Sequence, residues 1–325
     1  MTTRIKTAIG ADDGAILECS GVERRFGGIV AVTGVDLVIR QGEIFGLVGP
    51  NGSGKTTLTN AITGFYPPNE GRVRLAGNDI TGTAPHKVAK LGVARTFQNL
   101  ALFNGMSVLD NILLGRHIHM SPGVLRTALY WLAAQREEIE NRKIVEEVIE
   151  FLQLESIRHE LVDGLPIGLK KRVELARALV AEPQMLILDE PMAGMNQEEK
   201  GYMSRFILDA RAERGVSVLL IEHHMDVITG ICDRMLALNY GEMIASGIPK
   251  EVVKDPRVIE AYIGGSHVRF DEETVLGRRH DRRNSGAERL ETRFGNRASR
   301  KRAWDMERNH LGGIRPRGGG LCGWA

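Results

Sequence analysis

Three short segments of the chain are almost entirely apolar. They read EIFGLV at residues 43–48, MLILD at 185–189 and VSVLLIE at 216–222. Continuous apolar runs of this length are typical of parallel strands that are covered by helices on both faces. The pattern therefore predicts a parallel sheet built from these segments.

Helical patterns occupy the longer intervals between the apolar runs. Residues 55–63 read KTTLTNAIT and stop before Gly64, a residue that commonly ends helices. A longer tract over residues 124–154 repeats apolar side chains at helical spacing. A third helix is predicted over residues 169–181, because Pro183 disfavours its continuation.

Alternating patterns predict a second, antiparallel part. Residues 15–40 alternate β-branched with polar side chains and contain glycine pairs, and residues 71–80 read as a strand with a polar turn. Residues 233–247 resemble a hairpin that turns at Tyr240–Gly241. Strands and helices alternate around the central runs, so the predicted class is α/β with an antiparallel part and a helical insertion.

A phosphate-binding motif follows the first apolar run. Residues 49–57 read GPNGSGKTT and match G-x-x-x-x-G-K-[S/T] in full, with a strand before and a helix after, which is the context the motif requires. Backbone N–H groups of such a loop surround phosphate oxygens at a helix N-terminus. Lys55 adds a cation, and the Thr56 hydroxyl is placed to bind Mg²⁺. The predicted nucleotide-binding residues are Gly49, Pro50, Asn51, Gly52, Ser53, Gly54, Lys55, Thr56 and Thr57.

Two adjacent carboxylates end the run at 185–189, which continues as MLILDE. Charge at the end of a buried strand is costly unless it is compensated. Asp189 is therefore a candidate Mg²⁺ ligand, and Glu190 is a candidate general base for an attacking water. The alternative is an exposed strand end that leads into a turn at Pro191.

Two further polar residues are candidates from their position alone. Gln98 lies in RTFQNL and is a possible ligand of Mg²⁺ or water, although its local chemistry alone favours ordinary surface polarity. His223 follows the run at 216–222, where parallel sheets bind ligands. Neighbouring side chains of an extended backbone point to opposite faces, so His223 and His224 are not expected to share a metal ion.

Composition places the chain among ordinary globular proteins. Of its 325 residues 42% are hydrophobic and 26% charged, and no run reaches the roughly 18 apolar residues of a membrane helix. Lys and Arg number 43 against 41 Asp and Glu, so the charge of +2 does not indicate a nucleic-acid partner. The three cysteines, far apart in the sequence, and the absence of an apolar leader indicate a soluble intracellular protein.

Charge and apolar content change near Gly264. Residues 265–325 carry fourteen Lys or Arg against eight Asp or Glu, and few of them are apolar. Such a composition rarely supports a packed core. We therefore expect a flexible leader at 1–14, a folded domain at 15–264 and a basic, disordered tail at 265–325.

The ordered set of motifs resembles the nucleotide-binding subunit of ABC transporters. Phe26, GPNGSGKTT, Gln98, ILDE and His223 occur in that family's order across nearly all of residues 15–264. RTFQNLALFNGMSVLDNILLGRH, DEPMAGMN and LIEHHM look more narrowly like the ATPase of branched-chain amino-acid importers. The resemblance implies a P-loop NTPase core, an antiparallel β subdomain and an inserted α-helical signature subdomain at about 99–175.

The resemblance also implies a role for particular residues. Phe26 would stack on adenine, with a core aromatic as the alternative. Gln98 would lie in the loop that senses the membrane subunits, and His223 would contact the γ-phosphate and Glu190. Residues 193–196 would form the loop that crosses to the opposite subunit. The chain also departs from its relatives at position 224, where it has histidine and they usually have aspartate.

The signature segment departs from the family's usual LSGGQ. Residues 165–169 read LPIGL, and only Gly168 and the following helix N-terminus remain to offer backbone donors to a phosphate. Some importer relatives carry LPYGL followed by QKRVEL, which KKRVEL at 170–175 resembles. We interpret the segment as a subfamily variant and Gly168 as a nucleotide-binding residue; the alternative is a degenerate site.

The resemblance implies that the chain hydrolyses ATP with Mg²⁺ on the cytoplasmic face of the inner membrane. Its expected partners are transmembrane permeases, a second ATPase subunit, identical or homologous, that completes an ATP-sandwich dimer, and a periplasmic solute-binding protein. The alternatives are an exporter-type ABC ATPase, a soluble ABC ATPase and a binding module with an inactive site. The sequence does not identify the transported solute.

Overall fold

The computed structural model describes residues 14–98, 100–118 and 131–263. All of them belong to the first of two units, Met1–Val268, and the second is Arg269–Ala325. The predicted leader up to residue 13, the beginning of the helical tract predicted at 124–154 and the predicted tail lie outside the described residues.

The predicted parallel sheet is confirmed. In the described part of the chain it has six strands in the order β10-β9-β3-β8-β7-β6. Neighbouring strands from β9 to β6 are parallel, and β10 is antiparallel to β9. The strands are β3 (Ile44–Val48), β6 (Val93–Arg95), β7 (Met185–Asp189), β8 (Ser217–Ile221), β9 (Arg234–Asn239) and β10 (Glu242–Gly247).

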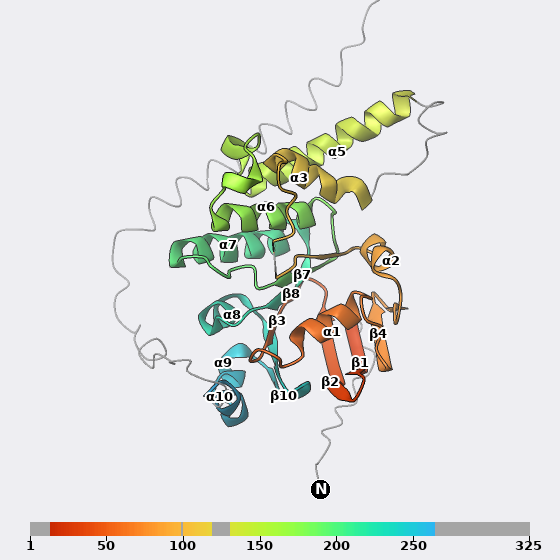
Figure 1. Cartoon of the computed structure of the whole chain (residues 1–325), viewed down its shortest axis with the longest axis vertical. Coiled ribbons are helices and arrows are strands. Elements are labelled where there is room, and N and C mark those ends of the chain that lie inside the picture. The colour runs from red at the N-terminus through yellow and green to blue at the C-terminus, as the bar shows by residue number, and fades with distance from the viewer. Residues whose placement is uncertain (1–13, 99, 119–130, 264–325) are drawn as a thin grey trace, which may run out of the picture. The chain divides into compact units, whose positions relative to one another are not determined.

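The segments predicted as antiparallel at 15–40 and 71–80 form a separate sheet of the order β2-β1-β4-β5. The hairpin predicted at 233–247 is the antiparallel pair β9 and β10 of the first sheet. A shared core joins the two sheets, because Leu37 of one, Phe45 of the other and Leu58 of helix α1 belong to one buried cluster. Figure 1 shows α1 beside this sheet. Its strands are β1 (Ala15–Phe26), β2 (Ile29–Arg40), β4 (Glu70–Leu75) and β5 (Asn78–Asp79).

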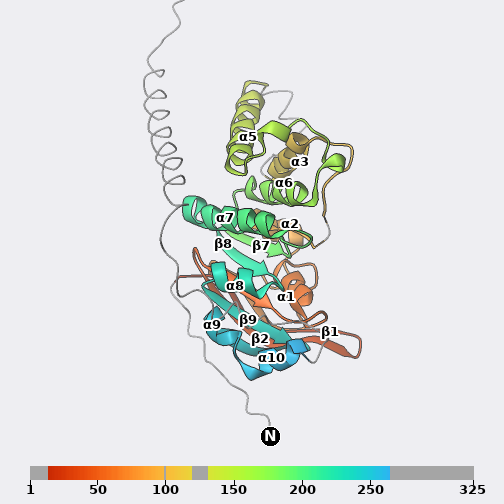
Figure 2. The same cartoon turned by 90° about the vertical axis from the view of Figure 1, so that its left-hand side faces the viewer.

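Three helices, α3, α5 and α6, group together away from the antiparallel sheet (Figure 2). Helix α6 begins at Ile167, two residues before the predicted start, because Pro166 already takes the N-cap position. The described helices are α1 (Lys55–Ile62), α2 (Pro85–Lys90), α3 (Val108–Leu114), α5 (Trp131–Phe151), α6 (Ile167–Leu179), α7 (Gln197–Arg214), α8 (Met225–Ile231), α9 (Pro249–Val252) and α10 (Pro256–Ile263).

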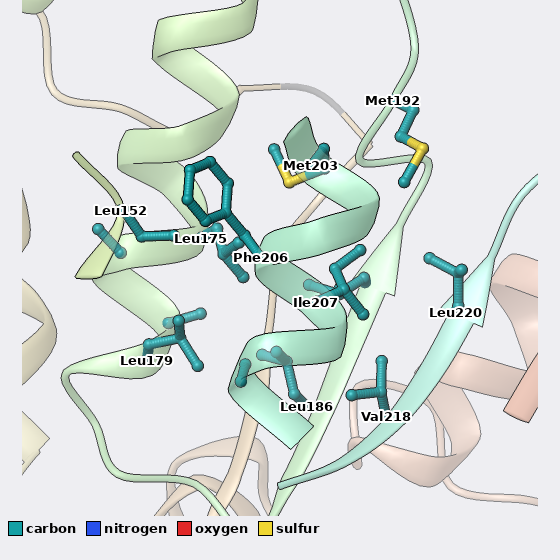
Figure 3. Packing of buried hydrophobic residues seen from close by; sticks show 14 of the residues in the cluster. Leu152, Leu175, Leu179, Leu186, Met192, Met203, Phe206, Ile207, Val218 and Leu220 are labelled. Carbon is teal, nitrogen blue, oxygen red and sulfur yellow. The ribbon is translucent and has the colours of Figure 1, made fainter. Parts of the chain in front are cut away.

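Helix α7 connects the helical group with the parallel sheet. In Figure 3 the Phe206 ring points toward Leu175 of α6, while Ile207 lies toward the strands β7 and β8. All three side chains are at most 3% exposed. The three side chains belong to one buried cluster, which joins the inserted helices to the sheet that carries the candidate site. Burying one such side chain stabilises the fold by about 1.5–3 kcal/mol.

A search of the described residues finds no helix with the length and apolar character needed to cross a membrane.

Candidate active site

The phosphate-binding loop begins where β3 ends, and α1 follows it (Figure 1). Gly54, the N-cap of α1, has a φ of 100°, which side-chain-bearing residues rarely adopt. A Cβ atom at Gly54 would also lie 2.6 Å from the Ala31 carbonyl oxygen of β2. Only glycine fits this position. No side chain at residue 54 therefore covers the backbone N–H groups at the start of α1.

The hairpin predicted at 233–247 supports the loop from the side. Its turn, Tyr240–Gly241, has φ values of 45° and 82°, as a two-residue type I′ turn requires. The Gly241 N–H donates to the Ser53 carbonyl at 3.0 Å, and the Gly241 carbonyl accepts from the Thr33 N–H at 2.8 Å. Backbone groups from both sheets therefore hold the loop in place.

Lys55 points its ammonium group back into the loop. Its Nζ lies 2.7 Å from the Gly49 carbonyl oxygen and 2.9 Å from that of Pro50. Loss of solvation lowers the pKa of Lys55 below its usual 10.5, while the negative charges of Glu190 and Asp189 act in the opposite direction. A buried cation whose nearest partners are neutral carbonyls is suited to meet an anionic ligand such as a phosphate.

Several residues of the loop and of the first turn of α1 are accessible to solvent. Asn51, Gly52 and Thr56 are exposed, and Gly54 and Thr57 are half-buried. Thr56 therefore carries an accessible hydroxyl in the first turn of α1. Thr56, Asp189 and Gln98 each carry a side-chain oxygen of the kind that Mg²⁺ prefers.

Asp189 makes an ion pair that the sequence did not suggest. Its Oδ2 lies 2.9 Å from the Nη2 of Arg95, and the two side chains are 5% and 7% exposed. Arg95 ends the short strand β6 and also donates from Nη1 to the Asn60 Oδ1 at 2.6 Å. The Asp189 N–H is 3.2 Å from the Thr96 hydroxyl. The buried charge at this strand end is compensated, as its cost demands.

Glu190 brings the predicted catalytic residues together. Gln98 donates from Nε2 to its Oε2 at 3.2 Å, and the Nδ1 of His223 lies 3.9 Å from its Oε1. Glu190 has a φ of 49°, which is uncommon and strained for a residue with a side chain. A carboxylate held between an amide and an imidazole, next to the phosphate-binding loop, can accept a proton from a water molecule.

Sequence reasoning missed Glu222, which directly follows the buried strand β8 and is the last residue of the apolar run at 216–222. Its side chain is fully buried, Oε1 accepts from the Met192 N–H at 2.9 Å and Oε2 from the His223 N–H at 3.3 Å. Burial raises the pKa of Glu222 above its usual 4.5. The carboxylate thereby joins the loop after Glu190 to the segment that carries His223.

The expectation that His223 and His224 point to opposite faces is wrong. Their ring centroids lie 4.2 Å apart, because strand β8 ends at Ile221 and strict alternation ends with it. With Glu222 they form a cluster of potential metal-ligand atoms within 4.8 Å of one another. The Nδ1 of His224 is also 3.5 Å from the Lys200 ammonium, a cation that disfavours a metal ion there.

Gly168 of the signature segment packs against α7. A Cβ atom at this position would lie 2.4 Å from Oε1 of Glu199. The other oxygen of that carboxylate accepts from the Asn196 N–H at 2.9 Å and completes the capping box at the start of α7. Glycine therefore has a packing reason here, while Pro166 and Ile167 are the exposed residues at the beginning of α6.

Phe26 ends β1 and is 40% exposed. Its ring meets that of Tyr66 edge to face at 5.3 Å, and the Arg24 guanidinium lies 4.7 Å from its centroid. A cation over one face leaves an aromatic ring suited to further stacking. Tyr66 and Arg24 were not found from the sequence. Tyr66 lies in the loop after α1 and meets Phe26 only through the fold, whereas Arg24 is on β1 itself, two residues before Phe26.

Comparison with family models gives two matches. Residues 32–193 match the model described as ABC transporter, and residues 242–268 match that of the branched-chain amino acid ATP-binding cassette transporter.

Several curated relatives and solved structures are similar to this chain over most of its length. The high-affinity branched-chain amino acid transport ATP-binding protein BraF of Pseudomonas aeruginosa is 39% identical over 77% of this chain and 98% of its own length. LivG of Escherichia coli K12, with the same description, is 36% identical over the same shares. A nucleotide-free ATP-binding cassette from an ABC transporter matches with a TM-score of 0.68 and 34% identity, over 77% of this chain and 99% of its own. The ADP conformation of such a cassette matches at 0.67 and 34%, over the same shares.

Proposed function

Because this chain belongs to the family of branched-chain amino-acid ABC transporter ATP-binding proteins, a family of ATP hydrolases, we propose that it powers an importer for branched-chain amino acids or related small solutes. The observation that carries the proposal is the meeting of Gln98, Glu190 and His223 beside the phosphate-binding loop. The relatives favour this reading over an exporter-type or a soluble ABC ATPase.

The loop residues bind the nucleotide. The backbone N–H groups at the start of α1 and the Lys55 ammonium receive the phosphate oxygens, and Phe26 stacks on the adenine. The fit rests on Gly54, whose position admits no side chain, and on the buried ammonium of Lys55. A cassette similar to this chain has been solved with ADP, which supports nucleotide as the ligand.

A magnesium ion fits the oxygen donors of Thr56, Asp189 and Gln98. When bound it would neutralise charge on the transferred phosphoryl group. Asp189 is already held by Arg95, so its carboxylate has a fixed orientation before any ion arrives. Thr56, Asp189 and Gln98 would therefore hold the ion, and Arg95 is the counter-charge of Asp189 in this structure.

Hydrolysis requires a base that takes a proton from the attacking water. Glu190 is suited to this role because Gln98 and His223 approach one carboxylate oxygen each and so fix its orientation. His223, whose Nδ1 lies 3.9 Å from Glu190, would contact the γ-phosphate and link it to that carboxylate. Lys55 adds the charge neutralisation that phosphoryl transfer needs.

A second ATPase subunit completes each site. Gly168 and the N-terminus of α6 serve the nucleotide of the opposite subunit, and residues 193–196 lie in the loop that crosses to it. The capping box of Asn196 and Glu199 holds the end of that loop against Gly168. The two segments that carry the predicted dimer contacts therefore lie next to each other.

The other partners are transmembrane permease subunits, next to which the chain would act at the cytoplasmic face of the membrane, and a solute-binding protein. The ATPase dimer binds ATP more tightly in its closed state than in its open state, so ATP favours closure. Closure in turn shifts the membrane subunits from one of their two conformations to the other. The folded domain at 15–264 suffices for this task, and the basic residues of 265–325 are an appended segment.

A transport assay tests the proposal. The chain would be reconstituted with its permeases, its second ATPase subunit and its binding protein in vesicles, and ATP-driven uptake of labelled leucine would be measured. We expect uptake that stops when ATP is replaced by a non-hydrolysable analogue. ATP hydrolysis without uptake of leucine or a related small solute would contradict the importer assignment and leave the ATPase assignment intact.

A further inference from the structure

Helix α10, the last helix in the described part of the chain, reaches the first residue of the phosphate-binding loop. The Gly49 N–H donates a hydrogen bond of 2.8 Å to the hydroxyl of Tyr262, a residue 213 positions later in the chain. Both groups are buried, and Tyr262 is 7% exposed. Tyr262 lies in residues 242–268, which match the branched-chain transporter model, whereas Gly49 lies in the part that matches the general ABC model.

Gly49 is held on its other sides as well. A Cβ atom there would lie 2.3 Å from the Leu238 carbonyl oxygen and 2.5 Å from the Ser53 hydroxyl. Its own carbonyl oxygen accepts from the Lys55 ammonium at 2.7 Å. One residue therefore connects the Tyr262 hydroxyl, through its N–H, to the cation that is proposed to meet the phosphates, through its carbonyl.

Tyr262 is itself fixed in place. With Val258, one helical turn earlier, it packs into the large buried core of the domain. Desolvation raises the pKa of its hydroxyl to about 12, and the oxygen of that hydroxyl accepts the bond from Gly49. A buried N–H that loses its acceptor carries the full cost of its desolvation, so the loop would move to find another partner.

We propose that Tyr262 is a positioning residue for the phosphate-binding loop. Through Tyr262, helix α10 sets the nucleotide affinity of the site. The inference rests on the proposed nucleotide binding and adds to it a residue outside the ABC motifs. It acts through Gly49 and does not itself touch the nucleotide. Removing the hydroxyl weakens binding of ATP and ADP alike, because the loop cradles the phosphates that the two share.

The test compares Tyr262→Phe with two controls on the purified full-length chain. Val258→Ala removes packing from the same helix but leaves the hydroxyl, and Tyr202→Phe removes a half-exposed hydroxyl that lies 3.4 Å from Glu198 on α7. The affinities for ATP and ADP are measured by calorimetric titration with Mg²⁺, and the midpoint of thermal unfolding is measured without nucleotide.

We expect Tyr262→Phe to weaken both nucleotides about tenfold, which corresponds to the loss of one such hydrogen bond. In steady-state turnover by the assembled transporter KM should rise with little change in kcat. Val258→Ala should lower the unfolding midpoint and leave both affinities unchanged, and Tyr202→Phe should change neither.

Three results would overturn the inference. A Tyr262→Phe variant that is less stable but binds ATP and ADP as tightly as the wild type would show that the hydroxyl serves folding alone. Equal losses of affinity in Tyr262→Phe and Val258→Ala would show that helix packing, and not the hydroxyl, is responsible. A wild-type chain that binds neither nucleotide would contradict the proposed function and the inference together.

Discussion

The carboxylate of Asp189 and the guanidinium of Arg95 lie 2.9 Å apart at the carboxyl edge of the parallel sheet, where both side chains are nearly buried. The candidate Mg²⁺ ligand is therefore paired with a cation of its own chain. The pair links the end of β7 to β6, the strand that leads into Gln98.

Replacing Arg95 with Met should destabilise the nucleotide-free domain. The variant leaves the Asp189 charge buried without its partner, and breaking such a pair costs about 3 kcal/mol or more. Urea unfolding measures the difference. The control is Arg257→Met, whose pair with Asp255 is on the surface, is screened by solvent and should contribute little. Equal unfolding free energies for the two variants would refute this role of Arg95, and Asp189→Asn added to Arg95→Met should recover part of the loss.

The sequence predicted the parts of this site that depend on short-range pattern. The phosphate-binding loop, the buried strands that end at Asp189 and Ile221, and the turn at Tyr240–Gly241 all follow from local residue order. Arg95 was missed because β6 has three residues, too few to show a period. The contact of Tyr262 with Gly49 joins distant segments and has no local signal.

One prediction from local pattern failed. The argument that His223 and His224 diverge assumed an extended backbone, and the strand had already ended. The prediction that Gly168 donates to a phosphate stands untested, and the structure adds that its lack of a side chain makes room for Glu199. Both residues lie where the chain enters or leaves a regular element, because tertiary contacts then decide the direction of side chains.

Glu222 should make stability depend on pH. Burial raises its folded-state pKa above 4.5, so the carboxyl stabilises the fold when it is protonated, and this contribution is lost as pH rises from the unfolded toward the folded pKa. Glu222→Gln cannot titrate. The unfolding free energy of the variant relative to wild type should therefore increase from about pH 4.5 upward. Chemical denaturation at a series of pH values measures it, and a pH-independent difference would contradict the raised pKa.

Replacing Gly168 with Ala should impair the dimer more than the fold. The added Cβ displaces Glu199 and disturbs a helix cap worth about 1 kcal/mol, while alanine gains about the same in helix propensity. Turnover in the assembled transporter should fall about tenfold, as for one lost phosphate hydrogen bond. ATP affinity of the isolated chain should stay unchanged, because the segment serves the opposite subunit.

Gly164→Ala is the matched control for that variant, since a Cβ atom at Gly164 meets no atom within 4 Å. It should leave turnover unchanged. If Gly168→Ala and Gly164→Ala turn over ATP equally, the signature segment has no part in hydrolysis.

Replacing Lys55 with Ala should abolish measurable nucleotide binding. The variant removes the cation that the loop holds next to its carbonyls and leaves the phosphates with backbone donors alone. Calorimetric titration with ATP and Mg²⁺ measures the effect, and Lys254→Ala at an exposed position is the control. An affinity equal to that of wild type would mean that the loop does not bind phosphates.

The most direct test of the account is ATP turnover by Glu190→Gln in the complete transporter, measured together with ATP affinity. Glutamine keeps the shape of the side chain but cannot accept the proton, so turnover should fall about a hundredfold or more. ATP should bind with unchanged affinity, and the ATPase dimer should remain closed on it. Turnover equal to that of the wild type would contradict the assignment of Glu190 as the base, and with it the proposed mechanism.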